Sequence, residues 1–416
     1  MRLFYNLFIY LLRLGMGLGA MFNYKLKRGL AGRRRACHDV SKTLNSNDEV
    51  IWMHAASLGE YEQGLPVLKE LHDKMPFCKI LVTFFSPSGY EHIIKKKPEF
   101  VDCITYLPFD TKTEVVAFTS LFKTKLFFTV KYDFWYNLLE ELKVQGAKTF
   151  VISALFYESQ VYFKPYGGWF VKELKRNLDW IFNQTKHSTA LVKSLGITTT
   201  STSGDTRYDR VKELRKRDNS VPYISEFLQN KLCLVFGSSW EAEERIAQMI
   251  AQKTEGHKII IAPHDMKRVD ALKAIFPHAL LYSEVNDIEI QRLQTAEVLI
   301  IDSIGLLSKL YSYAHVAVVG GGFHSAGLHN ILEAATFYKP VFIGNQYRKN
   351  PEADALIVAG GAKSFEDEFY AAPFIVDMLS RPQVLEDMGK AAGQFIDEQP
   401  NSTEIVLKKV MNDLVK

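Results

Sequence analysis

The chain is poor in cysteine. Its 416 residues include only four cysteines, which are scattered at Cys37, Cys78, Cys103 and Cys233. No two of them form a CxxC pair or have the spacing of metal ligands, so the sequence indicates neither a zinc module nor a disulfide framework. Free thiols in a reducing compartment are the simplest interpretation.

Disordered stretches, internal repeats and low-complexity segments are also lacking. Hydrophobic residues make up 47% of the chain and charged residues 24%, which is an ordinary balance for a globular protein. A chain of 416 residues is longer than one hydrophobic core usually serves, and it therefore predicts two domains.

Excess positive charge is absent outside the N-terminus. The net charge of the whole chain is +4, yet residues 1–40 carry +7 and the remainder carries −3. The basic character therefore belongs to the N-terminal segment, and a nucleic-acid-binding surface is not indicated.

An apolar segment runs from Leu3 to Tyr24, close to the roughly 20 residues that cross a bilayer, although Arg13 interrupts it. It lacks a cleavage site of small residues, which disfavours a removed signal peptide. Lysines and arginines over residues 25–35 place its C-terminal side on the cytoplasmic face. We expect residues 1–40 to form a membrane anchor with a basic linker. A buried or interfacial helix is the alternative, and whether the anchor spans the bilayer or lies in one leaflet stays open.

Short apolar runs alternate with helical stretches along the rest of the chain. Strands are predicted at 49–54, 79–84, 126–130, 149–152 and 180–182, and again at 232–237, 258–262, 298–301, 316–320 and 341–343. Helical crossovers between them predict α/β domains with parallel sheets covered on both faces. The predicted domains cover 41–210 and 211–400, and a C-terminal helix covers 401–416. Ligands of such sheets bind beyond the carboxyl ends of the strands, which predicts a site in a cleft between the domains.

The first motif with chemical potential is His54-Ala55-Ala56-Ser57-Leu58-Gly59-Glu60, which runs from a strand into a helix. Ser57 and Glu60 have the spacing of a capping box, so Glu60 could simply close its helix. Alternatively, Glu60 projects into the cleft as a base that the helix N-terminus keeps ionised. His54 is the rival base, but a histidine that ends a buried strand is more often a core residue.

A second motif combines a glycine-rich turn, Gly320-Gly321-Gly322, with Asn330 and Glu333 further on. Such a turn lets backbone N–H groups reach a phosphate. Ser325 stands where a GxGxxG pattern needs its third glycine, and no acidic residue ends the next strand, which disfavours a nicotinamide dehydrogenase. Asn330 is suited to capping the helix and Glu333 to binding ribose hydroxyls, and a mere capping pair is the alternative.

The third motif is Ser238-Ser239-Trp240-Glu241-Ala242-Glu243-Glu244, a weaker candidate for an anion site at a helix start. Together the three motifs resemble those of the 3-deoxy-D-manno-octulosonic acid (Kdo) transferases of lipopolysaccharide synthesis. The family's His-x-x-Ser-x-Gly-Glu matches residues 54–60, its Ser-Thr-His-x-Gly-Glu-Glu matches 238–244, and its Gly-Gly-His-Asn-Pro-Leu-Glu matches 327–333.

This resemblance implies a GT-B fold, in which two Rossmann-like domains face each other across a cleft. It further implies an inverting transfer of Kdo from CMP-Kdo to a lipid A precursor, lipid IVA, on the cytoplasmic face of the inner membrane. No cofactor is expected. No Asp-x-Asp pair sits at a strand end, so we also expect the reaction to be independent of metal ions.

The resemblance also implies roles for individual residues. The general base falls on Glu60, a transition-state cation on Arg207, and a further catalytic position on Lys131. The contacts to CMP fall on His264, Asp265, Ile304, Gly305, Leu306, Asn330, Ile331, Leu332 and Glu333.

Three positions depart from the family pattern. Pro263-His264-Asp265 replaces Pro-Arg-His, Lys131 replaces an acidic residue, and Ser153-Ala154-Leu155 replaces Asn-Ala-Arg. The first change removes a fixed positive charge at the nucleotide, since histidine is only partly charged near neutral pH. Another nucleotide-sugar enzyme of this layout, a UDP-sugar transferase or epimerase, is the nearer alternative. A membrane-tethered binding protein is the remoter one.

Aromatic and basic side chains mix between residues 157 and 176, where Tyr157, Tyr162, Phe163, Tyr166, Trp169 and Phe170 stand among three lysines and an arginine. Rings beside cations suit a membrane interface and a phosphorylated lipid acceptor. An ordinary helix with its aromatic face on the sheet is the alternative.

Overall fold

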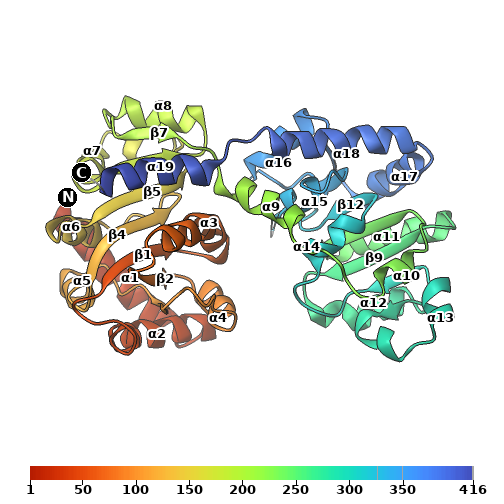
Figure 1. The fold of residues 1–416 in the computed structure, drawn as a ribbon, viewed down its shortest axis with the longest axis horizontal. Coiled ribbons are helices and arrows are strands. Elements are labelled where there is room, and N and C mark those ends of the chain that lie inside the picture. Colours follow the sequence, from red (N-terminus) through yellow and green to blue (C-terminus); the bar gives the residue numbers. More distant parts are fainter. Residues whose placement is uncertain (326, 349, 415–416) are drawn as a thin grey trace. The chain divides into compact units, whose positions relative to one another are not determined.

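A computed structural model describes residues 1–325, 327–348 and 350–414. The chain forms two compact units. Unit 1 comprises Met1–Arg210 and the segment from Pro400 onward, and unit 2 comprises Val211–Gln399. Each unit is built on a seven-stranded sheet with parallel pairing, flanked by helices (Figure 1).

The sheet of unit 1 has the strand order β3-β2-β1-β4-β5-β6-β7. Its strands are β1 (Glu49–Ala55), β2 (Lys79–Phe84), β3 (Cys103–Tyr106), β4 (Lys123–Val130), β5 (Lys148–Ala154), β6 (Trp180–Asn183) and β7 (Thr200–Thr202). All five strands that the sequence predicts in this half are present. β3 and β7, the two edge strands, were missed, because they are short and neither is a continuous apolar run; β7 consists of Thr200, Ser201 and Thr202.

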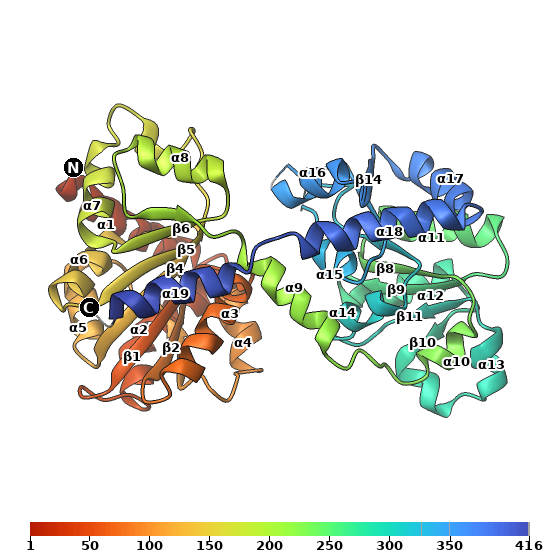
Figure 2. The ribbon, with the colours of Figure 1, turned by 45° about the horizontal axis from the view of Figure 1, so that its top comes forward.

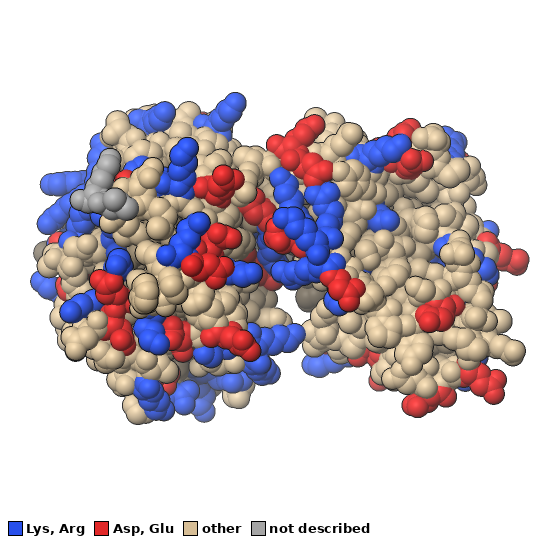
Figure 3. Space-filling view, viewed as in Figure 1, with Lys and Arg blue, Asp and Glu red and all other residues tan. Residues whose placement is uncertain are grey.

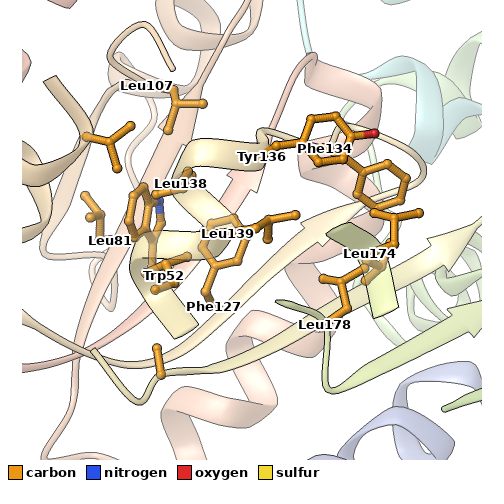
Figure 4. Packing of buried hydrophobic residues seen from close by; sticks show 14 of the residues in the cluster. Trp52, Leu81, Leu107, Phe127, Phe134, Tyr136, Leu138, Leu139, Leu174 and Leu178 are labelled. Atoms are coloured by element: carbon orange, nitrogen blue, oxygen red, sulfur yellow. The ribbon is translucent and has the colours of Figure 1, made fainter. Parts of the chain in front are cut away.

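Successive residues of β1 point to opposite faces of this sheet. Trp52 packs with Leu81 and Phe127 beneath α2 (Tyr24–Ser41), α5 (Lys112–Thr119), α6 (Tyr136–Val144) and α7 (Gly168–Asn177), as Figure 4 shows in part. Ile51 and Met53 face the other side, under α3 (Leu58–Lys74), α4 (Pro87–Ile94) and α19 (Ser402–Leu414). Figure 2 shows α19 lying across unit 1 near α3. Of the predicted C-terminal helix at 401–416, residues 415 and 416 lie outside the described residues.

The sheet of unit 2 has the order β10-β11-β9-β8-β12-β13-β14. Its strands are β8 (Cys233–Ser239), β9 (Lys258–Pro263), β10 (Leu280–Leu281), β11 (Val298–Ile300), β12 (Val316–Val319), β13 (Val341–Gly344) and β14 (Ala362–Phe365). The helices are α10 (Ile224–Leu228), α11 (Glu241–Lys253), α12 (Val269–Ile275), α13 (Ile290–Thr295), α14 (Leu307–Leu310), α15 (Leu332–Ala335), α16 (Pro351–Val358), α17 (Glu368–Leu379) and α18 (Pro382–Asp397). α8 (Lys186–Ser194) belongs to unit 1, and α9 (Thr206–Lys216) contains the division between the units.

The N-terminal apolar segment forms a helix of its own, α1 (Arg2–Gly19), which packs on unit 1 along one side. Ile9 is fully buried, and Tyr5 packs against Tyr136 and Trp169. The other side of α1 exposes a row of large apolar residues that includes Leu3, Phe4, Leu7, Phe8, Leu11, Leu14 and Leu18. Within the described part of the chain, no helix combines the length and the apolar character that crossing a membrane requires.

Candidate functional site

Each sheet has a topological switch point, where the order of strands changes direction. It lies between β1 and β4 in unit 1 and between β8 and β12 in unit 2. The loops that leave the carboxyl ends of these strands diverge at that point, so ligands of open α/β sheets bind there. The three sequence motifs follow β1, β8 and β12. The fold therefore brings each motif to a switch point of its own unit.

Glu60 lies in the first turn of α3, and its side chain is 9% exposed. Its Oε2 accepts a hydrogen bond from the Ala56 N–H at 2.5 Å, and Ser57 Oγ accepts one from the Glu60 N–H at 3.5 Å. Ser57 is thus the N-cap, as the capping-box interpretation predicts. Among the described residues nothing donates to Oε1 of Glu60, so one carboxylate oxygen has no hydrogen-bond donor.

The pKa of Glu60 is raised above its ordinary value by burial and by the negative charge of Asp133. The Ala56 N–H, Lys131 and His54 act in the opposite direction but do not outweigh these two causes. The N–H at the helix start thus favours the ionised form, as expected, but burial costs the charged form more than this one hydrogen bond returns. A raised pKa makes Glu60 a better proton acceptor once it is ionised.

Asp133 is the residue at this site that the sequence interpretation missed. His54 Nε2 lies 2.6 Å from its Oδ2, and Trp135 Nε1 donates to the same oxygen at 3.1 Å. The other ring nitrogen of His54 lies 2.9 Å from Thr83 Oγ1, and the ring is fully buried. The interpretation of His54 as a hydrogen-bonded core residue is confirmed. Asp133 could have been found from its position just beyond β4, the strand paired with β1.

Lys131 is the first residue beyond β4 and has a left-handed backbone, with φ 63°. Its N–H donates to the Ile152 carbonyl at 3.0 Å, which fixes the turn. Its ammonium group lowers the pKa of Glu60. Lys131 therefore offsets part of the effect that Asp133 has on the pKa of Glu60.

Arg207 is held by a buried carboxylate. Its Nε and Nη2 lie 2.9 and 2.7 Å from Asp205 Oδ2. Burial alone would raise the pKa of Asp205, but the Arg207 guanidinium keeps it below its ordinary value. Gln63 Nε2 donates to Asp205 Oδ1 at 2.9 Å, and Gln63 stands one helical turn after Glu60 on α3. The structure thus ties Arg207 to the helix that carries Glu60.

In unit 2 the loops at the switch point carry a cluster of aromatic rings. The Trp240 indole stacks on the His264 imidazole, with centroids 4.6 Å apart, and contacts His324 edge-on at 4.4 Å. His329 lies 4.6 Å from His264. Burial and the neighbouring imidazoles lower the pKa of His329 to about 4, and burial also lowers the pKa of His264. Near neutral pH the ring of His329 is therefore uncharged.

Glu243 and Glu244 of the third motif have structural partners. Glu243 accepts hydrogen bonds from the Trp240 N–H at 2.9 Å and the Gly321 N–H at 3.1 Å, and burial raises its pKa to about 7. Glu244 is paired with Arg268 at 2.6 Å. The hypothesis of a phosphate-binding glycine turn needs free backbone N–H groups. The Gly321 N–H, however, already donates to the carboxylate of Glu243.

The glycines of this turn also have a packing explanation. A Cβ on Gly320 would lie 2.0 Å from the Ser238 carbonyl oxygen, and one on Gly322 would lie 2.7 Å from the Gly344 nitrogen. Any side chain at either position would therefore push apart the chain segments that leave β8, β12 and β13.

Asn330 and Glu333 contact each other as the capping alternative predicts. Asn330 Oδ1 accepts from the Leu332 N–H at 3.1 Å, and Asn330 Nδ2 donates to Glu333 Oε1 at 3.2 Å. The side chains of Ile331 and Leu332 are fully buried, so only their backbone is available to a nucleotide.

The remaining predicted nucleotide contacts follow β9 and β11, which lie on the β8 side of the switch point in the sheet. Asp265 caps a short turn by accepting from the Lys267 N–H at 3.0 Å. Ile304 is 72% exposed, Gly305 has φ 101°, and Leu306 precedes α14. All of these positions thus lie beyond the carboxyl ends of strands in the sheet of unit 2. Among the described residues, no group of three or more His, Cys, Asp or Glu is arranged to hold a metal ion.

Comparison with known proteins agrees with this layout. The sequence pattern of the family described as 3-deoxy-D-manno-octulosonic-acid transferase (kdotransferase) matches residues 29–210. The chain is 27% identical to the 3-deoxy-D-manno-octulosonic acid transferase of Aquifex aeolicus, over 82% of this chain and 88% of that protein. It is 25% identical to the enzyme of that name from Rickettsia bellii, over 75% of each chain.

Among solved structures, the UDP-GlcNAc 2-epimerase of Neisseria meningitidis shares the fold, with a TM-score of 0.61 at 15% identity over 88% of this chain and 100% of that one. The two parallel-sheet α/β units therefore resemble the GT-B fold of glycosyltransferases. Among such proteins, the chain is similar to the Kdo transferases, in the family pattern over residues 29–210 and in relatives of that name.

Proposed function

We propose that this enzyme transfers Kdo from CMP-Kdo to a lipid A precursor such as lipid IVA, with inversion at the anomeric carbon. The observation that carries the proposal is the environment of Glu60, a buried carboxylate of raised pKa at the switch point of unit 1. The similarity to Kdo transferases supports CMP-Kdo as the donor and a lipid A precursor as the acceptor. The environment of Glu60 supports its role as the general base.

In the proposed reaction, Glu60 takes the proton of a sugar hydroxyl on the acceptor. The hydroxyl oxygen forms a bond to the anomeric carbon of Kdo from the side opposite the phosphate. The bond between that carbon and the phosphate oxygen breaks, and CMP leaves with the electron pair. Arg207, oriented by Asp205, supplies positive charge on the side of unit 1, although the carboxylate offsets part of it.

We further propose that the donor phosphate is bound in unit 2 by the rings of His264 and His329 beside Trp240, in place of the arginine usual in the family. Their neutral N–H groups donate to the phosphate, and a bound anion favours protonation of the rings. Asn330 and Glu333 stand beyond β12, where they can bind the ribose. We propose that neither a cofactor nor a metal ion takes part.

We also propose that the enzyme works on the cytoplasmic face of the inner membrane, with α1 lying in the interface. The exposed apolar side of α1 and the exposed bases of α2 favour this arrangement. Blue side chains gather over the region of α2 and α4 in Figure 3. In the segment 157–176, Trp169 and Phe170 pack against Tyr136, so these rings belong to the core, while Tyr166 stays 64% exposed towards a membrane or acceptor.

The test is to incubate the full chain with lipid IVA and CMP-Kdo generated in situ, with a chelator present, and to weigh the lipid product. We expect a mass gain of one or more Kdo units and, at the anomeric carbon, the configuration opposite to that of the donor. Product formed from a UDP-sugar instead, or a thermal shift with UDP but not CMP, would favour the alternative of another nucleotide-sugar enzyme.

A further inference from the structure

Beside α1 lies a cavity of about 310 Å³ that the transfer reaction does not use. Arg13 and Gly17 of α1 line one side, and Arg33 and Arg34 of α2 line another. Phe109, in the loop after β3, contributes an apolar wall. We call this space the arginine cavity. Its lining thus combines three guanidinium groups with hydrophobic surface.

The charges of the arginine cavity are not balanced within the protein. Glu114, which also lines it, is paired with Arg13 at 2.6 Å. Arg33 and Arg34 have no ion pair with any described residue, which leaves the lining with a net charge of +2. Arginine remains charged in proteins, so this excess persists at every physiological pH.

Arg33 is the more informative of the two, because it is only 5% exposed. Its Nη1 and Nη2 donate to the carbonyl oxygens of Gly29 at 3.2 Å and Phe85 at 2.7 Å, and its Nε has no hydrogen-bond acceptor. The guanidinium lies 4.2 Å from the ring centroid of Phe85 and 5.3 Å from that of Phe109. A buried cation held by carbonyls and rings alone is costly, and a bound anion would reduce that cost.

The position of the cavity indicates what kind of anion it takes. Leu14 and Leu18 each follow a cavity residue of α1 and are 60% and 59% exposed. An anionic group at the arginines would therefore be adjacent to the apolar side of α1. A ligand that matches both surfaces has a charged head and hydrocarbon chains.

We propose that the arginine cavity binds the phosphate headgroup of an anionic phospholipid, whose acyl chains lie along the exposed apolar side of α1. This inference rests on the proposed membrane association of α1. It goes beyond that proposal because it predicts a site selective for one class of lipid, whereas lysines and arginines in general are attracted to any anionic membrane surface. The bound lipid is not the acceptor of the transfer.

Two glycines of α1 give a matched pair of variants. A Cβ at Gly15 or at Gly17 meets nothing within 4 Å, so a side chain can start at either position without a clash at its first atom. Gly17 lines the cavity and Gly15 does not. Gly17→Leu thus fills the cavity without changing the charge, while Gly15→Leu adds the same side chain to the same helix outside it.

Cys37 supplies the readout, since it lines the cavity and is half-buried, whereas Cys78, Cys103 and Cys233 are buried. The full chain in mild detergent is alkylated with iodoacetamide, and the label on Cys37 is followed by mass spectrometry. Three probes are added in turn: monomeric dihexanoyl phosphatidylglycerol, dihexanoyl phosphatidylcholine and inorganic phosphate. We expect the anionic lipid to slow alkylation of Cys37 in the natural chain and in Gly15→Leu, and the apparent affinity to fall at least about fivefold in Gly17→Leu.

A second pair tests the charge. Arg34→Gln should weaken protection by a similar factor, whereas Lys27→Gln, on the same helix but outside the cavity, should not. Equal protection by phosphatidylcholine, protection by phosphate as good as that by the lipid, or identical behaviour of the two leucine variants would each overturn the proposal.

The outcome is separable from the other proposals. Transfer of Kdo to detergent-dispersed lipid IVA should be unchanged in Gly17→Leu. A natural chain without this activity would contradict the proposed function and not the lipid site. Flotation with neutral vesicles tests the membrane association of α1 itself, independently of the cavity.

Discussion

Replacing Glu60 by glutamine separates its hydrogen bond at the start of α3 from the role of general base that we propose for it. The side-chain amide of the Glu60→Gln variant would keep an oxygen that accepts from the Ala56 N–H, so the start of α3 should stay capped. The loss of a charge-assisted bond costs about 1 kcal/mol, and the relief of burying a carboxylate offsets part of it. The free energy of unfolding should therefore change by less than about 1 kcal/mol.

The rate should respond very differently. An amide cannot take the acceptor's proton, and loss of a general base slows reactions by about 10²- to 10⁴-fold. That factor corresponds to about 3 to 5 kcal/mol in the activation barrier. A steady-state assay of Kdo transfer, paired with urea denaturation of the same preparation, measures both quantities.

Two control variants belong to the same helix. Ser57→Ala removes only the cap and should cost about 1 kcal/mol in stability with the rate largely kept. Glu70→Gln changes an exposed carboxylate of α3 and should alter neither quantity. A Glu60→Gln enzyme that retained more than about a tenth of the natural rate, or that lost rate only in proportion to its folded fraction, would refute the assignment of Glu60 as the base.

Three further predictions concern charge. In the Asp133→Asn variant the pKa of Glu60 should fall, because one cause of its elevation is removed. The acid limb of the pH–rate profile should then move to lower pH. An unmoved limb would show that Asp133 does not influence the pKa of Glu60. Arg207→Ala leaves Asp205 buried without its partner, so denaturant titration should show a loss of about 3 kcal/mol, whereas a loss below about 1 kcal/mol would show that the pair contributes little. The folded pKa of His329 lies below that of the unfolded chain, so the unfolded state binds more protons as pH falls from about 6.5 to about 4. Stability should therefore drop by roughly 2 kcal/mol between about pH 7 and about pH 5, and His329→Gln should flatten this slope.

Much of the architecture could be predicted from the chain alone. Apolar runs such as 79–84 and 258–262 are buried on both faces of a parallel sheet, and such strands are legible because nearly every residue in them is hydrophobic. The motif that contains Glu60 was also legible, since a strand end, a capping serine and an acidic residue lie within one short segment. Short edge strands such as β10, with two residues, carry too little pattern to be seen.

What the tertiary structure decided is the environment of each side chain. The sequence determined that Glu60 begins a helix after a buried strand, and local hydrogen bonding follows from that. It did not show that Asp133, 73 positions further on, raises the pKa of Glu60, or that Arg207 is bound to Asp205. Those fields depend on burial and on which strand ends are neighbours, and both arise only when β1 pairs with β4.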